Sequence, residues 1–230
     1  MMIIAVTIII LILSAVIHEY AHGWMARRLG DTTAEDEGRL TLNPIKHLDP
    51  IGSILVPILL VISKVGFFIA WAKPVPYNPY NLIDRKYGEL KVAIAGPVSN
   101  IILAAVFALI VRFLPLPDGA LISLINGFFT GDDAAIMALT QGSLAVSLVF
   151  ISLVACFINL ALAIFNMMPI PPLDGSKVLA AFLPEPFRSK FSSLERYGLI
   201  IVIFLVMLGF FRIIIPVLSW VFFAFIGIPI

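Results

Sequence analysis

The residues best suited to chemistry in this chain are His18, Glu19 and His22, which form the pattern His-Glu-x-x-His. Residues four apart in a helix project to nearly the same side, about 40° apart at 3.6 residues per turn. The two imidazoles can therefore bind one metal ion from a single helical face. The carboxylate of Glu19 can accept a proton from a water on that ion, so the pattern predicts a metal site with an adjacent general base.

These residues lie in an unusual setting, because the run around them is apolar from Met1 onward. Ionisable groups at membrane depth are costly, and a functional role is the first interpretation to consider for them. The alternative is a polar patch buried between helices. Such a patch would need several hydrogen-bond partners inside lipid, which makes it the more expensive arrangement.

The composition predicts an integral membrane protein. Of the 230 residues, 61% are hydrophobic and 13% are charged, whereas soluble domains are nearer half apolar and a quarter charged. We expect residues 1–230 to form a single integral membrane domain. The net charge of +1 gives no argument for nucleic acid as a partner. Cys156 is the one cysteine, so an intramolecular disulfide and a cysteine-based zinc site are excluded, and we expect it to pack as a small apolar residue.

The fold class expected is an all-α polytopic membrane protein. Apolar runs predict four spans, the last of them kinked at Pro216, at about 2–27, 92–113, 143–168 and 197–222. The first run lacks a basic start and a cleavage site before His18, so we interpret it as a retained helix rather than a signal peptide. Alternation over residues 37–43 predicts a short strand or hairpin.

Charge sets the expected orientation in the membrane. Of the 15 basic residues, four fall in each of three loops and none falls in 114–142; the three loops are 27–50, 73–91 and 170–196. The positive-inside rule places these three loops in the cytosol and both termini outside. Loops 27–50 and 73–91 share a side only if 51–72 is a re-entrant or surface-lying segment.

A catalytic zinc usually takes three protein ligands, so a third is needed beside His18 and His22. Asp174 is the best candidate, because it follows a Pro-rich break at the cytosolic end of a span, at the depth of the two histidines. Asp-Gly is also a common turn pair, which is the alternative for Asp174. His47 competes as a ligand, although a loop histidine bonded to backbone or water is the simpler interpretation. A regulatory or substrate-facing role is a further alternative for it.

Three stretches together resemble the signature set of the site-2 proteases, which are intramembrane zinc metalloproteases: His18-Glu19-Tyr20-Ala21-His22, Gly96-Pro97-Val98-Ser99-Asn100, and Asn166 to Gly175 with Pro169, Pro171 and Asp174. The closest likeness is to the compact prokaryotic branch without PDZ or CBS domains. The resemblance implies His18, His22 and Asp174 as ligands of one Zn²⁺ and Glu19 as the general base. It also implies Asn100 and Asn166 as polar groups near the substrate backbone or the oxyanion.

The expected function is hydrolysis of peptide bonds in transmembrane protein substrates, near the cytosolic side of a prokaryotic plasma membrane. An extended segment from 37–43 or 73–79 could hold the unwound substrate by edge pairing. The alternative is a non-proteolytic membrane zinc protein that transports or senses metal, or an inactive relative. Transport would require ionisable groups at several depths, and residues 92–113 and 143–165 carry almost none.

Overall fold

The computed structural model describes residues 2–49 and 72–228, and the regular structure of these residues is entirely helical. Within the described residues, three helices are long and apolar enough to cross a membrane: α1 (Met2–Arg28), α4 (Gly88–Phe113) and α7 (Leu144–Asn166). At 1.5 Å per residue each is about 35 to 40 Å long, more than the roughly 30 Å of a hydrocarbon core. These helices match the first three predicted spans. The predicted re-entrant segment 51–72 lies, apart from its last residue, outside the described residues.

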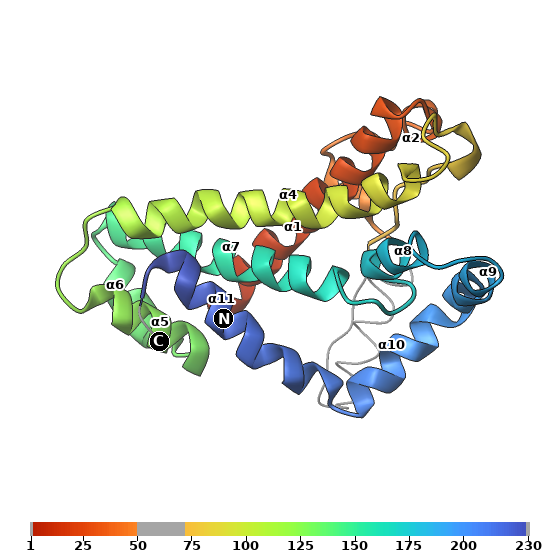
Figure 1. The fold of residues 1–230 in the computed structure, drawn as a ribbon. Helices are drawn as coiled ribbons and strands as arrows, with labels where there is room; N and C mark the ends of the chain where they lie inside the picture. Colours follow the sequence, from red (N-terminus) through yellow and green to blue (C-terminus); the bar gives the residue numbers. More distant parts are fainter. Residues whose placement is uncertain (1, 50–71, 229–230) are drawn as a thin grey trace.

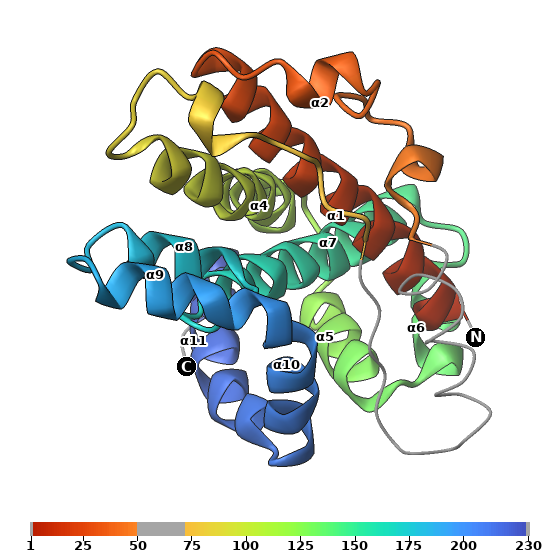
Figure 2. The same cartoon turned by 90° about the vertical axis from the view of Figure 1, so that its right-hand side faces the viewer.

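The three long helices bring distant parts of the sequence to one end of the molecule. Helix α4 packs against both α1 and α7, and α1 also contacts α7. Figure 1 shows α1 and α7 running toward the same end while α4 runs the other way. The short helices α8 (Asp174–Ala180) and α9 (Phe187–Ser192) follow α7 at that end. Figure 2, which faces it, shows α4 between α1 and α8.

Local sequence explains where the long helices stop and start. Helix α1 ends in a Schellman motif, in which Gly30 has φ of 100°, its N–H donates to the Arg27 carbonyl, and the Asp31 N–H donates to the Ala26 carbonyl. Arg28 in the last turn suits the negative end of the helix dipole. Helix α7 starts at a Ser143 cap, whose hydroxyl accepts the Val146 N–H at 3.3 Å.

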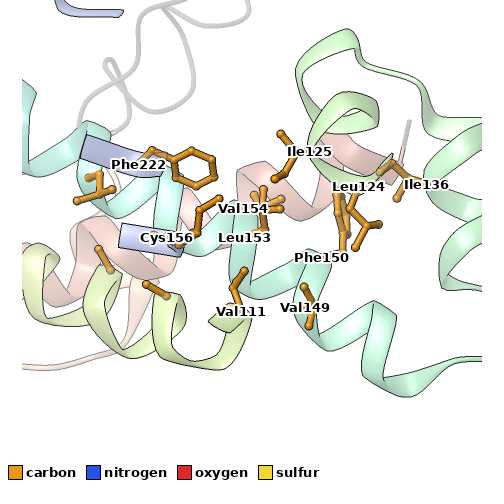
Figure 3. Close-up of a cluster of buried hydrophobic side chains, with 14 of the residues drawn as sticks. Val111, Leu124, Ile125, Ile136, Val149, Phe150, Leu153, Val154, Cys156 and Phe222 are labelled. Atoms are coloured by element: carbon orange, nitrogen blue, oxygen red, sulfur yellow. The ribbon is translucent and has the colours of Figure 1, made fainter. Parts of the chain in front are cut away.

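The largest apolar core lies toward the opposite end, where α5 (Ala120–Thr130) and α6 (Asp133–Thr140) cover the bundle. Figure 3 shows side chains from α4, α5, α6, α7 and α11 (Ile214–Ile226) meeting there, among them Leu124, Leu153 and Phe222. Cys156 is fully buried in the same cluster, as its predicted packing role requires. This core holds the long helices in register without contributing polar groups.

The fourth predicted span, 197–222, is not one continuous helix. The chain there forms η4 (Ser193–Tyr197), α10 (Gly198–Met207), η5 (Phe210–Ile213) and α11. Gly209 has φ of 69°, a left-handed conformation that ends α10. The two helices have 10 and 13 residues, about 15 and 20 Å, so neither alone crosses a bilayer. Pro216 lies in the first turn of α11, where a missing N–H costs little, and the break therefore falls at Gly209 rather than at Pro216.

The strand or hairpin predicted at 37–43 is absent from the described structure. A four-residue helix, α2 (Thr33–Asp36), precedes this stretch, and η1 (Pro44–His47) follows it. The N–H groups of Arg39 and Leu40 both donate to the Ala34 carbonyl, at 2.8 and 3.0 Å. These groups are therefore used in local turns. Residues 73–78 have no regular secondary structure, and η3 (Pro79–Asn81) follows them.

Candidate metal centre

Three side chains from two helices that are far apart in the sequence lie close together in space. His18 and His22 lie one turn apart on α1, and Asp174 is the first residue of α8. The Nε2 atoms of the two histidines are 3.0 Å apart, and Asp174 Oδ2 lies 3.1 Å from His18 Nε2 and 3.3 Å from His22 Nε2. Both histidines are buried, with 6% and 9% of the residue surface exposed. Among the described residues, the histidines, cysteines and acids that could together hold a metal ion are these three.

The spacing of these donor atoms fits a zinc ion. Bonds of about 2.0 to 2.1 Å in a tetrahedral arrangement place neighbouring ligand atoms about 3.3 Å apart. The observed separations of 3.0 to 3.3 Å are close to that value. Gly96 on α4 keeps the same space open, because a Cβ there would lie 2.6 Å from His18 Nε2 and would collide with His22 Nε2. Two nitrogens and one carboxylate oxygen are also a donor set that zinc accepts.

Helix α4 fixes the orientation of both imidazoles from behind. His18 Nδ1 donates to Asn100 Oδ1 at 2.6 Å, and His22 Nδ1 donates to the Val92 carbonyl at 2.7 Å. Because each Nδ1 carries the proton, each Nε2 keeps a lone pair that points toward the common site. Outer partners of this kind set the tautomer and orientation of metal-binding histidines.

Asn100 belongs to a polar network that joins the three long helices. Its amide group donates to Asn159 Oδ1 at 2.8 Å, and Asn159 in turn donates to the Ser14 hydroxyl at 2.9 Å. Asn100 and Asn159 are both completely buried. The amide of Asn100 is thus used in holding His18. This arrangement matches a positioning role better than the substrate or oxyanion contact that the family resemblance implies.

Asn159, Ser14 and Gly96 are site residues that the sequence reasoning did not single out for a role. A signal for Asn159 was available, since a polar side chain inside an apolar span is costly and usually functional. Gly96 belongs to the motif Gly96 to Asn100. The reason for a glycine there is its short distance from the imidazoles, which sequence alone does not give.

We expect Asn100→Leu to lower zinc affinity by about 10- to 100-fold, the usual effect of removing a partner of a metal-bound histidine. Metal content after dialysis against zinc buffers measures the change. Ser99→Ala is a matched control, because the Ser99 hydroxyl donates to the Gly96 carbonyl of its own helix at 2.7 Å. An Asn100→Leu protein with the zinc affinity of the Ser99→Ala protein would contradict the role of Asn100 in positioning His18.

Glu19 lies beside this centre and is partly exposed. Its Oε2 accepts the backbone N–H of Val75 at 2.9 Å. The carboxylate interacts electrostatically with His22. It is therefore close to the ligands, and none of the hydrogen bonds among the described residues uses its other oxygen.

Asn166 and His47 make hydrogen bonds to nearby backbone carbonyls. Asn166 is partly buried, and its amide group donates to the Leu162 carbonyl of its own helix at 3.0 Å. His47 has 2% of its surface exposed and donates through Nε2 to the Thr41 carbonyl at 2.8 Å. His47 is not part of the ligand cluster, so the backbone-bonded interpretation describes it better than the ligand one.

Comparisons with known proteins relate this chain to proteins named as zinc metalloproteases. Residues 81–209 match the family model described as Peptidase family M50. The Bacillus subtilis protein named "Putative zinc metalloprotease YwhC" is 38% identical over 205 residues, covering 88% of this chain and 81% of that protein. Two proteins with the same description are more distant. Rip2 of Mycolicibacterium smegmatis is 26% identical over 84% of this chain, and MJ0611 of Methanocaldococcus jannaschii is 32% identical over 71%. The chain spans 63% of the length of each of these two. No solved structure gives a significant match.

Proposed function

This chain belongs to peptidase family M50, and from that premise we propose that it is an intramembrane zinc metalloprotease acting on transmembrane protein substrates. The observation that carries the proposal is the meeting of His18, His22 and Asp174 within 3.3 Å of one another, beside the Glu19 carboxylate. A structural zinc site is usually closed by four protein ligands. Three ligands with a neighbouring carboxylate are the arrangement of a hydrolytic site.

Zinc held by His18, His22 and Asp174 would supply Lewis-acid activation of a water molecule and of the scissile carbonyl. Glu19 accepts the proton of the attacking water and then delivers it to the leaving nitrogen. Val75 keeps one oxygen of Glu19 occupied, so the other oxygen carries the proton. Asn100 and the Val92 carbonyl hold the two imidazoles in place during these transfers.

We place the site near the cytosolic face of a prokaryotic plasma membrane. His18 and His22 lie within the last eleven residues of α1, about 9 to 15 Å along the axis from its end at 1.5 Å per residue. Arg27 and Arg28 follow directly, and the positive-inside rule assigns that end to the cytosol. At this depth, water can reach the centre from the cytosol while a substrate helix arrives from the lipid.

Cleavage of a model transmembrane substrate by the purified protein in lipid vesicles tests this function. We expect one zinc per chain, loss of cleavage on chelation, and recovery when zinc is returned. Zinc uptake into vesicles with no cleavage would instead support the transport alternative. A protein that binds zinc but neither cleaves nor transports would support an inactive relative.

Asp174→Asn tests the third ligand. We expect zinc affinity to fall more than about 100-fold, because loss of an inner ligand should exceed the 10- to 100-fold effect of losing an outer partner. Metal content after purification measures it. A variant that retains zinc as the unmodified protein does would remove Asp174 from the ligand set.

A further inference from the structure

We propose that residues 73–78, called the strap below, hold the Glu19 carboxylate in its working position, and that buried Arg39 is the positioning residue that shapes the strap. The proposal rests on the proposed function, because it assigns these residues a role only if Glu19 is the base. The strap reaches the site from a different part of the chain than the three metal ligands do.

The contact between the strap and Glu19 depends on a single N–H group. Val75 lies between Pro74 and Pro76, which have no N–H, so it provides the only backbone donor of the three residues. That N–H donates to Glu19 Oε2 at 2.9 Å. Val75 has 5% of its surface exposed and packs closely on α1, since a Cβ on Gly23 would lie 2.8 Å from Val75 Cγ1. Gly23, one turn beyond Glu19, therefore permits the close approach.

Arg39 holds the strap just before this contact. Its Nη2 donates to the carbonyls of Lys73 and Pro74, at 2.8 and 3.2 Å. Its exposed fraction is 6%, and its Nε is buried without a hydrogen-bond partner in the part of the chain that the structure describes. Removing a guanidinium from water is costly unless it is paired. A buried arginine that contacts backbone carbonyls is well suited to fixing the path of the chain.

Further bonds fix both ends of the strap. The Lys73 N–H donates to the His47 carbonyl at 2.8 Å. At the other end, the Asn78 N–H donates to Asp31 Oδ2 at 2.7 Å. Burial alone raises the pKa of Asp31, but hydrogen bonds from Thr33, Asn81 and Asn78 outweigh it and lower that pKa, so Asp31 acts as a carboxylate anchor.

The strap is also tied to the helix that carries the third ligand. The Lys177 ammonium on α8 lies 5.2 Å from the centre of the Tyr77 ring. Lys177 is one turn from Asp174 on the same short helix. The strap thus connects the base on α1 with α8, whereas none of the described hydrogen bonds joins it directly to His18, His22 or Asp174.

Because the strap holds Glu19 and not the metal ligands, changing the strap should lower the cleavage rate without releasing zinc. Displacing a catalytic group by about 1 Å can lower the rate about 100-fold, while the metal ligands keep their contacts. Val75→Pro removes the N–H, and Val75→Ala keeps it while trimming the same side chain. We expect Val75→Pro to lower kcat 10- to 100-fold relative to Val75→Ala, with KM and zinc content unchanged between the two.

Arg39 provides a second measurement that does not depend on a proline. We expect Arg39→Ala to lower kcat about 10-fold or more at constant zinc content, and Arg39→Lys to recover part of the loss by donating to one carbonyl. Equal kcat for Val75→Pro and Val75→Ala would overturn the proposal, as would a loss of zinc parallel to the loss of kcat in Arg39→Ala. If the unmodified protein binds zinc but cleaves nothing, the proposed proteolytic function is wrong. The role of the strap is contradicted only by the variants, in a protein that does cleave, so the two outcomes can be distinguished.

Discussion

Glu19→Gln is expected to abolish cleavage while leaving the zinc content of the protein unchanged. The amide has the size of the carboxylate but cannot accept a proton from water. General acid–base catalysis contributes about 10²- to 10⁴-fold to rates, and this is the loss we expect in kcat. The amide oxygen of a glutamine can still accept the Val75 N–H, which lies 2.9 Å from Glu19 Oε2. The variant therefore changes proton transfer and leaves the position of the side chain and of the strap intact.

Glu35→Gln is a suitable control for this variant. Glu35 pairs with Arg27 through a 2.7 Å contact on the surface, with both side chains well exposed. The same chemical change there should leave the cleavage rate within about twofold, since surface ion pairs contribute little to the structure. Cleavage of a model membrane substrate and metal analysis are measured on both proteins. A Glu19→Gln protein that cleaves at the rate of the Glu35→Gln protein would show that Glu19 is not the base.

The ligand cluster could be predicted because its two determinants are visible in sequence. Helical spacing places His18 and His22 on one face, and the distribution of basic residues places Asp174 at their depth. Both inferences rest on constraints that sequence shows directly, namely helix geometry and the high free-energy cost of placing a charge in lipid. In the structure the three side chains lie together, as both constraints predict.

The supporting residues could not be predicted in the same way. Helix α7 is apolar on all sides, so no amphipathic pattern indicates which face meets α1 and α4, and Asn159 gives no hint of its partner. The contact of Arg39 with residues 73–74 joins segments 34 residues apart. The contact forms because residues 38–41 adopt local turns, whereas their alternating pattern predicted a strand. The break at Gly209 could not be predicted for a similar reason, because an apolar run indicates the length of a span but not its backbone conformation.

Gly96→Ala is expected to eliminate zinc binding and, with it, cleavage. A Cβ at position 96 would lie 2.6 Å from His18 Nε2 and from His22 Cε1, and would collide with His22 Nε2. Because zinc binds imidazole nitrogen at about 2.0 to 2.1 Å, the new methyl group would occupy the space that the ion needs. Neither imidazole can move away without losing its bond to Asn100 or Val92. We expect an affinity loss greater than about 100-fold, beyond the effect of losing one outer partner.

Folding should not account for the loss. Alanine favours a helix interior over glycine by about 1 kcal/mol, and Gly96 is inside α4. Gly88→Ala is the control on the same helix, because its Cβ would meet the Leu82 side chain at 3.0 Å, away from the imidazoles. Helix content by circular dichroism and zinc content are compared for the two proteins. Wild-type zinc affinity in a folded Gly96→Ala protein would mean that His18 and His22 bind their ion somewhere other than against α4, and the geometry proposed for the centre would be wrong.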